Sequence, residues 1–201
     1  MKDNGEAVRR FFRFLSSYKN LSEELHGYLL KTMKGKFCPG KEILFEHGDI
    51  FTDAVFVFSG YVGAYGFDEQ GSRQLISIHS GGSLIVGRSF LLQSPSDLEL
   101  VAMAGTYLLL IGHKEVMEVF ERFEGTREMA VRIMADFAEN GQMRLLLLRK
   151  EAGAVVLAFY RSHPELLGSG LLMDADLASY LLIGEQTLRN VRMKLLKQGK
   201  L

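Results

Sequence analysis

The first part of the chain has the spacing of apolar residues that is typical of helices. Between residues 6 and 34, apolar positions recur at mixed spacings of three and four, with charged residues between them. Ser22, followed by two glutamates, has the pattern of a helix start. We therefore expect helix over this stretch, with a new helix starting at Ser22. The apolar positions are Phe11, Phe12, Leu15, Leu21, Leu25, Leu29 and Leu30.

The pattern changes from Phe37 to about Ile111, where short apolar runs alternate with glycines at intervals of 8 to 12 residues. Turn signals at this spacing, between β-branched and aromatic runs, are typical of an all-β sandwich or barrel. Residues 55–58 are apolar on both faces and predict a central strand, and residues 67–71 predict a hairpin loop. The expected strands contain residues 43–45, 54–58, 61–67, 75–78, 98–102 and 108–111.

After His113 the glycines become rarer and residues that favour helices take over. A stripe of residues spaced by three or four positions fits one long helix with one apolar face. That face could pack on the β-region of its own chain or on the same helix of a second chain, and periodicity does not decide between the two. Residues 151–153 then offer a hinge, because glycine costs up to ~1 kcal/mol inside a helix. The stripe consists of Ala130, Met134, Phe137, Gly141, Leu145 and Leu148.

Two short helices are predicted near the end of the chain. Asp174 is expected to cap the first helix, which extends to Leu181, because its carboxylate can accept the unpaired N–H groups of the first turn. Residues 182–184 break this helix, and a second helix is expected over residues 185–197. With Ala178 small enough for a close crossing, the two helices would form a helix-turn-helix unit.

The charge of the last 17 residues supports contact with nucleic acid. They contain five basic residues and one acidic residue, a balance of +4 in a chain whose net charge is zero. Neutralising phosphates requires such local positive charge, although a solvated amphipathic helix is the alternative interpretation. Gln and Asn can pair with adenine, and Arg with guanine. The predicted DNA-binding residues are Gln186, Thr187, Arg189, Asn190 and Arg192.

The composition sets outer limits. The 201 residues suffice for one large domain or two small ones, and 47% hydrophobic with 24% charged residues excludes a disordered chain. Cys38 alone cannot form an intrachain disulfide or a four-thiolate cluster. The apolar runs fall far short of the roughly 20 residues of a membrane span, and no secretory signal is evident. We therefore expect a cytoplasmic protein without a membrane partner.

The order of these parts, helix, β-region, long helix and helix-turn-helix, resembles the CRP/FNR family of bacterial transcription regulators. The segment Phe37-Cys38-Pro39-Gly40-Lys41-Glu42-Ile43-Leu44-Phe45-Glu46-His47-Gly48-Asp49 resembles the opening of that family's cyclic-nucleotide-binding-type domain. Residues 55–62 resemble its next hairpin, and residues 176–181 with 186–188 resemble its helix-turn-helix. The resemblance covers nearly the whole chain.

The resemblance implies an α+β fold in three parts. These are an N-terminal β-roll or jelly-roll sensor domain over residues 1–122, a dimerisation helix over residues 123–150, and a C-terminal helix-turn-helix DNA-binding domain over residues 151–201. It also implies a homodimer on a near-palindromic operator, with half-sites on the order of 34 Å apart, and RNA polymerase as a further candidate partner. The implied dimer-interface residues are Met134, Phe137, Gly141, Leu145 and Leu148.

The sequence departs from the nucleotide-binding members of that family. Those members carry a Gly-Glu pair for the ribose and, some ten residues later, an Arg-Ser or Arg-Thr pair for the cyclic phosphate. Here no glutamate occurs between Glu69 and Glu99, and no arginine between Arg88 and Arg122. A cyclic phosphate would lose a charge-assisted bidentate contact, so cyclic AMP and cyclic GMP are not expected as effectors.

Another small molecule could bind in this stretch. Arg88 could receive a carboxylate or a phenolate while nearby serines donate hydrogen bonds, or Arg88 could be a solvated residue beside a pocket that has lost its ligand. The effector is thus unknown, and the predicted effector-binding residues are Gly87, Arg88, Ser89 and Ser96. No metal site is assigned and a haem site is left open, because the histidines have no recognisable ligand spacing. They are His26, His47, His79, His113 and His163.

The DNA-reading end departs from the family as well. Leu182 takes the place of a turn glycine with positive φ, Asn190 falls where an arginine is usual, and the sequence ends before the β-hairpin wing of many members. Two functions follow: an effector-responsive transcription regulator, or a ligand-binding or protein-interaction module that has lost specific DNA binding. An enzyme is not expected, since no Gly-rich phosphate loop, metal-spaced histidine cluster or nucleophile elbow occurs.

Overall fold

The structure is a computed structural model that describes residues 4–201. Two helices, α1 (Asn4–Ser16) and α2 (Glu23–Thr32), precede the first strand. Ser22 caps α2 as the sequence predicts, because its side chain accepts a hydrogen bond from the Leu25 N–H at 3.3 Å. The predicted helix start at Ser22 is therefore confirmed, but residues 17–22 break the helix and Lys34 already belongs to the first strand.

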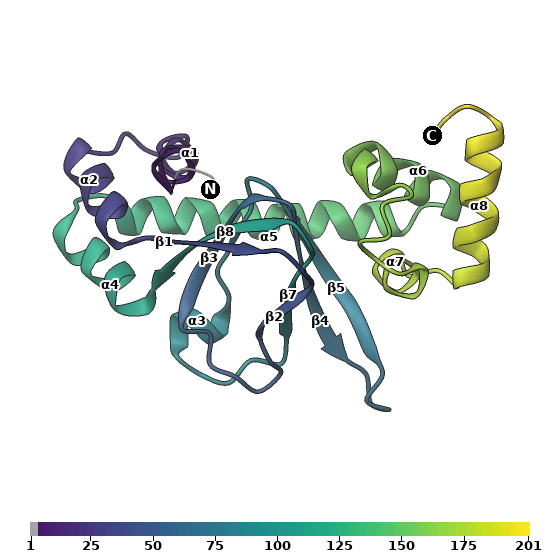
Figure 1. Ribbon diagram of the computed structural model, residues 1–201, viewed down its shortest axis with the longest axis horizontal. Helices are drawn as coiled ribbons and strands as arrows, with labels where there is room; N and C mark the ends of the chain where they lie inside the picture. Colours follow the sequence, from purple (N-terminus) through teal and green to yellow (C-terminus); the bar gives the residue numbers. More distant parts are fainter. Residues whose placement is uncertain (1–3) are drawn as a thin grey trace.

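Within residues 4–201, eight strands form two antiparallel four-stranded sheets, which together we call the β-roll (Figure 1). One sheet has the order β1-β8-β3-β6 and the other β2-β7-β4-β5. All six predicted apolar runs lie in or overlap these strands, whereas β1 and β6 were not expected. The strands are β1 (Lys34–Cys38), β2 (Glu42–Phe45), β3 (Asp53–Ser59), β4 (Tyr61–Phe67), β5 (Arg73–Ser80), β6 (Leu84–Ile85), β7 (Glu99–Ala102) and β8 (Thr106–Gly112).

Strand β3 is central, as its two apolar faces predict. It pairs with β8 on one side and with β6 on the other, so Val55 lies opposite both Leu110 and Ile85. The predicted hairpin loop between β4 and β5 is also confirmed. Asp68 closes it, since its carboxylate accepts hydrogen bonds from the backbone N–H groups of Gln70 and Ser72.

Helix α3 (Arg88–Leu92) lies between β6 and β7 within the β-roll, and α4 (His113–Arg122) and α5 (Thr126–Leu148) lead from β8 to the rest of the chain. Helix α5 runs past the β-roll and ends beside the C-terminal helices (Figure 1). Its buried residues, Thr126, Met129 and Ile133, all lie in its first half. None of them belongs to the predicted apolar stripe, of which Ala130, Phe137 and Leu148 are partly buried and Met134, Gly141 and Leu145 are exposed.

The C-terminal part consists of α6 (Ala152–Ser162), a 3₁₀ turn η1 (Pro164–Leu166), α7 (Asp174–Leu181) and α8 (Glu185–Lys197). The two predicted short helices are confirmed at α7 and α8. The break after α5 lies at residues 149–151, whereas Gly153 lies in the first turn of α6. The expected hinge therefore precedes this glycine, because a helix tolerates glycine near its N-terminus.

The buried apolar residues form two clusters. The first joins α1, α2, α4 and the start of α5 to the sheet that contains β3 and β8. The second joins Tyr61, Tyr65 and Leu75 of the other sheet to Phe159 of α6 and Leu177 of α7. The C-terminal helices thus share a core with the β-roll.

Candidate nucleic-acid interface and effector region

The turn between α7 and α8 ends α7 in a Schellman-type arrangement. The Ile183 N–H donates to the Ala178 carbonyl and the Leu182 N–H donates to the Ser179 carbonyl. This geometry puts Leu182 at φ +54° in the left-handed region, where glycine is the usual residue. The side chain of Leu182 is 70% exposed, so it gains little burial in return.

Asp174 does not cap α7, which corrects the expectation from the sequence. Met173 occupies the N-cap position without a side-chain hydrogen bond. The Asp174 carboxylate instead accepts two parallel hydrogen bonds from the Arg192 guanidinium, at 2.7 and 2.9 Å, and one from Arg189 Nε at 3.0 Å. Charged donors in a bidentate arrangement bind a carboxylate more strongly than backbone N–H groups. The Arg192 hydrogen bonds, followed by those of Arg189, lower the pKa of Asp174.

Four of the five predicted DNA-binding residues lie exposed on the first two turns of α8. Gln186 Nε2 donates to Asn190 Oδ1 at 2.9 Å, and Arg189 also donates to Glu185 at 2.9 Å. These contacts join exposed side chains one helical turn apart, and such contacts add little stability. They leave Gln186, Thr187 and Asn190 available to a partner, whereas Arg189 is also paired with the half-buried Asp174. The four exposed residues are Gln186, Thr187, Arg189 and Asn190.

Arg192 is placed differently from the other four. Its guanidinium is half-buried, and it donates to the Tyr160 hydroxyl on α6 at 3.1 Å as well as to Asp174. The hydrogen bonds to Asp174 raise the pKa of Arg192. Arg192 thus joins α8 to both α6 and α7, and this contact gives it a structural role that the sequence did not predict.

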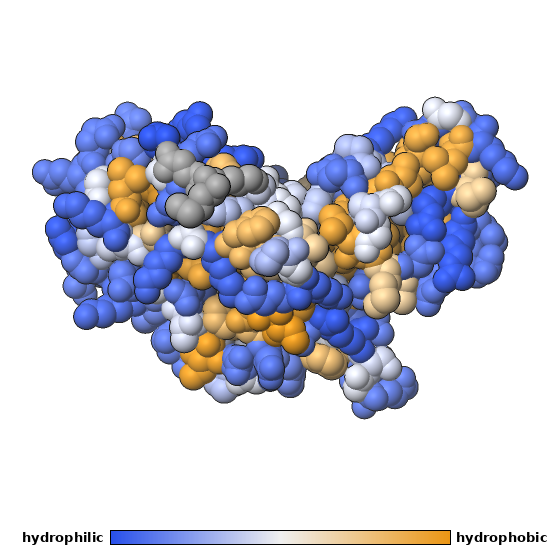
Figure 2. Space-filling model, in the orientation of Figure 1, coloured by the Kyte–Doolittle hydropathy of each residue, from blue (hydrophilic) through white to orange (hydrophobic). Residues whose placement is uncertain are grey.

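Three lysines lie at and just beyond the C-terminal end of α8. Lys194, Lys197 and Lys200 are exposed, and none of them has an ion-pair partner within residues 4–201. On the face that Figure 2 shows, the surface over α8 is hydrophilic along the lower part of the helix and carries hydrophobic patches toward its upper, C-terminal end. Phosphate contacts are thus available from the C-terminal half of α8.

Helix α7 is fixed to the edge strand β5. The Leu75 N–H donates to Ser179 Oγ at 3.0 Å, and the Tyr65 hydroxyl donates to Asp176 at 3.4 Å. A separate contact joins β4 to η1, where the Tyr61 hydroxyl donates to Glu165 and thereby lowers the pKa of Glu165. The helix pair is therefore held in one position relative to the β-roll.

The predicted dimer face is only partly covered by its own chain. Phe137 and Leu148 are partly buried against the two apolar clusters. Met134 and Leu145 are 41% and 60% exposed, and Gly141 faces open space. The apolar side chains Met143 and Leu146 are exposed on the same half of α5.

Of the predicted effector-binding residues, Arg88 faces solvent, whereas the two serines form hydrogen bonds with nearby backbone groups. Gly87 is the N-cap of α3, and Arg88 is exposed. The buried Ser89 hydroxyl accepts from the Phe51 N–H at 2.9 Å and donates to the Ser94 carbonyl at 2.6 Å. Ser96 Oγ accepts from the Leu98 N–H at 3.0 Å. Both serine hydroxyls thus have partners within the loops.

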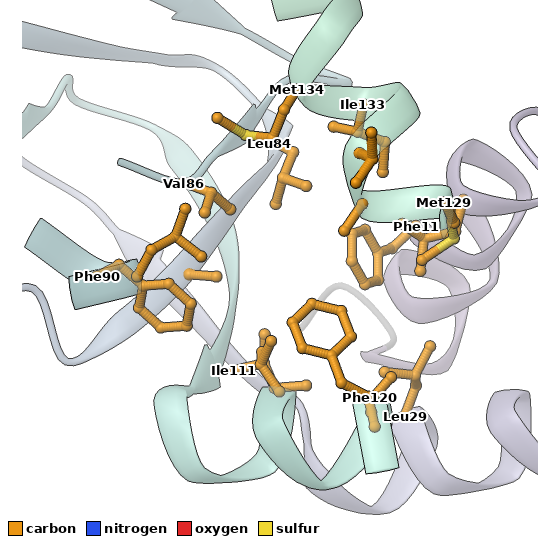
Figure 3. A pocket seen from close by; sticks show the side chains of 17 residues that line it. Phe11, Leu29, Leu84, Val86, Phe90, Ile111, Phe120, Met129, Ile133 and Met134 are labelled. Atoms are coloured by element: carbon orange, nitrogen blue, oxygen red, sulfur yellow. The ribbon is translucent and has the colours of Figure 1, made fainter. Parts of the chain in front are cut away.

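A cavity of about 320 Å³, open to solvent on one side, lies on the apolar side of α3, between α1, α2, α4, α5 and the sheet with β3, β6 and β8 (Figure 3). Sequence reasoning missed it, because its lining residues have the apolar pattern of ordinary core positions. They are Phe11, Leu15, Leu29, Ala54, Leu84, Val86, Phe90, Leu91, Ile111, Val116, Val119, Phe120, Met129, Ala130, Val131, Ile133 and Met134.

Within residues 4–201, no three or more His, Cys, Asp or Glu side chains are grouped so that they could hold a metal ion. Over the same residues, no helix has the length and apolar character needed to span a bilayer.

Comparison with known proteins identifies the fold. Residues 36–123 match the family described as "Cyclic nucleotide-binding domain". No curated protein matches the chain.

Solved structures extend the likeness beyond the β-roll. The Thermus thermophilus catabolite activator protein has a TM-score of 0.55 at 21% identity, over 90% of this chain and 87% of that one. FixK2 from Bradyrhizobium japonicum has a TM-score of 0.68 at 19% identity, over 84% and 86%. The sensor domain of the transcriptional regulator DNR from Pseudomonas aeruginosa has a TM-score of 0.54 at 14% identity, over 72% and 97%. The chain therefore has the fold of CRP/FNR-type regulators.

Proposed function

We propose that this chain is a homodimeric, effector-responsive transcription regulator that binds DNA through α8 and does not depend on a cyclic nucleotide. In this proposal residues 1–122 are the sensor domain, residues 123–150 the dimerisation helix, and residues 151–201 the helix-turn-helix DNA-binding domain. The likeness to a catabolite activator protein and to FixK2 supports it. RNA polymerase would be a further partner of such a regulator.

The observation that carries the proposal is the exposed start of α8. Gln186, Thr187, Arg189 and Asn190 share one solvent-facing surface there, and exposed lysines follow on the same helix. In a helix-turn-helix, the N-terminal residues of the second helix contact base edges in the major groove. Gln and Asn side chains can pair with adenine, and Arg with guanine.

Dimerisation is proposed through the second half of α5. Met143, Leu145 and Leu146 are exposed apolar side chains there, and Met134, in the first half of the helix, is 41% exposed. Contiguous exposed apolar surface of this kind marks an interaction site. A parallel pairing of two α5 helices would bury it and present two copies of α8 to one duplex.

A cyclic nucleotide does not suit the region around α3. Arg88 is exposed, and the carboxylate of the exposed Asp97 would repel a phosphate. The hydroxyls of Ser89 and Ser96 already have backbone partners. An anion at Arg88 stays a prediction, to be tested by titration with candidate acids against an Arg88→Ala variant.

A second candidate function keeps the fold without specific DNA binding. The carboxylates of Asp174 and Glu185 pair with Arg189, so a base or phosphate would have to displace them. Leu182 also gives the turn a strained residue. A module that binds a ligand or a protein would not require Arg189 to be free of its carboxylate partners.

Selection of bound duplexes from a random DNA library at physiological salt tests the proposal. The regulator requires enrichment of a defined sequence, and Gln186→Ala with Asn190→Ala should then weaken binding to that sequence at least tenfold, since each good base contact gives ~1–3 kcal/mol of discrimination. Gln198→Ala, an exposed change beyond the end of α8, is the control and should leave the affinity unchanged. A folded dimer that enriches no sequence favours the second function.

A further inference from the structure

We propose that the cavity between α3 and α5 is a binding site for a neutral, apolar small molecule. The site is distinct from the exposed Arg88 surface, and none of the residues predicted from the sequence to bind an effector lines it. Binding of a small molecule in this cavity does not require DNA. Only its role as the input of a regulator rests on the proposed function.

The size of the cavity points to a ligand. Protein interiors are close-packed, and voids much larger than a water molecule are few because the lining atoms lose their dispersion contacts. A volume of about 320 Å³ falls in the range of pockets that bind small molecules. It is roughly twice the ~150 Å³ of an apolar cavity that stays dry and takes up benzene. A two-ring aromatic or a medium-chain hydrocarbon would fit.

The chemistry of the wall restricts the ligand to apolar molecules. Side chains of seventeen residues line the cavity, and Figure 3 shows only carbon atoms and methionine sulfurs among them. A charged or hydrogen-bonding group buried there would lose its hydration without gaining a partner, which costs several kcal/mol by order of magnitude. The wall contains no His, Cys or Tyr side chain, and the thioethers of Met129 and Met134 are its only side-chain groups of a kind that binds haem iron.

A second copy of the chain does not fill this space. The inner wall includes Phe90 and Leu29, which are 1% and 2% exposed, whereas the helix of a partner is ~10 Å or more across. Such a helix could lie over Val131 and Met134 at the exposed rim on α5, but it would leave the interior empty. The cavity and the proposed dimer face are therefore neighbours, and Met134 belongs to both.

Occupancy would act directly on α5. This helix supplies Met129, Ala130 and Ile133 to the wall, and the same helix continues into the proposed dimer face. A ligand that fits one position of α5 better than another shifts the population toward that position. The geometry thus offers an apolar input to the helix that connects the sensor domain to α6.

Binding of naphthalene to the full chain tests the site. The titration follows naphthalene fluorescence, with the chain mass measured by sedimentation in the same buffer and without DNA. Ala130→Phe places a ring in the cavity from α5 and should weaken binding at least tenfold. Ala135→Phe, an exposed change on the same helix outside the wall, is the matched control.

The inference requires saturable binding of one naphthalene per chain, lost in the Ala130→Phe variant and kept in the Ala135→Phe variant. A raised thermal midpoint of the Ala130→Phe variant would show that it folds and that the ring fills the void. Absence of saturable binding overturns the proposal, as does binding that both variants retain. Binding that disappears when the chain dimerises would also overturn it, because the second copy would then be the occupant.

Discussion

Ser179 Oγ accepts a hydrogen bond from the Leu75 N–H at 3.0 Å, and this contact joins α7 to the exposed edge of the β-roll. Strand β5 is the edge strand of its sheet, so its outward N–H groups have no strand partner. The Ser179 hydroxyl also donates to the Asp176 carbonyl at 2.8 Å, which fixes its orientation. The Ser179 side chain is thus one of the contacts that position α7 on the β-roll, beside the Tyr65–Asp176 hydrogen bond and the shared apolar core.

Substituting Ser179 by alanine should loosen this contact. Without the hydroxyl, the Leu75 N–H loses its partner, at a cost of ~1–3 kcal/mol for a buried donor. Hydrogen exchange of the Leu75 amide should then become at least fivefold faster. Ser77→Ala on the same strand is the control, since Ser77 contacts His79 rather than α7. Equal exchange in the wild-type chain and the Ser179→Ala variant would contradict the role assigned to this contact.

Leu182 holds a backbone conformation that glycine adopts without strain. A left-handed conformation costs roughly 1–2 kcal/mol for a residue with a Cβ, and the exposed side chain of Leu182 contributes little burial. Leu182→Gly should therefore raise the free energy of unfolding in urea by ~0.5–1 kcal/mol, after the entropy that glycine adds to the unfolded chain. Ala175→Gly, inside α7 with an exposed side chain, should lower it instead. A loss of stability in both variants would contradict the strain at Leu182.

The Asp174–Arg192 pair should stabilise the C-terminal helices. Asp174→Asn leaves the half-buried guanidinium of Arg192 without its counter-charge, and we expect a loss of ~1–2 kcal/mol, below the cost of breaking a fully buried pair. Glu185→Gln, which affects only an exposed pair with Arg189, should cost less than ~1 kcal/mol. Equal losses in the two variants would contradict this assignment.

The same pair predicts a dependence of stability on pH. The pKa of Asp174 is lowered in the folded state by its arginine partners. Its contribution is therefore fully present above the unfolded value of ~3.9 and is lost as the pH falls through the lower folded value. Between pH 5 and 2, the free energy of unfolding of Asp174→Asn should fall less steeply than that of the wild-type chain. Parallel curves would show that Asp174 does not bind the arginines in solution.

Leu145 should contribute to dimerisation. Replacing it by glutamate puts a charge into the proposed α5 pairing, and the loss of a buried leucine alone is worth ~1.5–3 kcal/mol. Sedimentation equilibrium should show a dimer dissociation constant at least tenfold higher. Leu92→Glu, a change of another exposed leucine on α3, should leave the constant unchanged. A dimer that tolerates Leu145→Glu would mean that another surface pairs.

Most helices, strands and turns follow from sequence patterns that extend over only a few residues. The cap at Ser22, the apolar faces of residues 55–58 and the polar loop at Asp68 each act over a few residues, so periodicity and turn chemistry predict them. Leu182 was recognised from the same kind of rule, as a leucine where a turn needs positive φ.

Contacts between distant residues were not predictable in this way. Asp174 has the pattern of a helix cap, and only the arrangement in space brings it to Arg192, eighteen residues later. The wall of the cavity draws Phe11, Leu84, Phe120 and Met134 from four separate elements, each with the pattern of a core residue. The docking of α7 on β5 rests on a backbone N–H at Leu75, a group that every sequence position except proline carries.

The symmetry of the DNA sequences enriched from a random library tests the central claim most directly. A homodimer paired through α5, with one α8 in each of two successive major grooves, predicts a near-palindrome whose half-sites lie ~10 base pairs apart. The duplex should bind two chains, as measured by sedimentation of the complex. Enrichment of a single unrepeated half-site, or of no sequence by a folded dimer, would contradict the account.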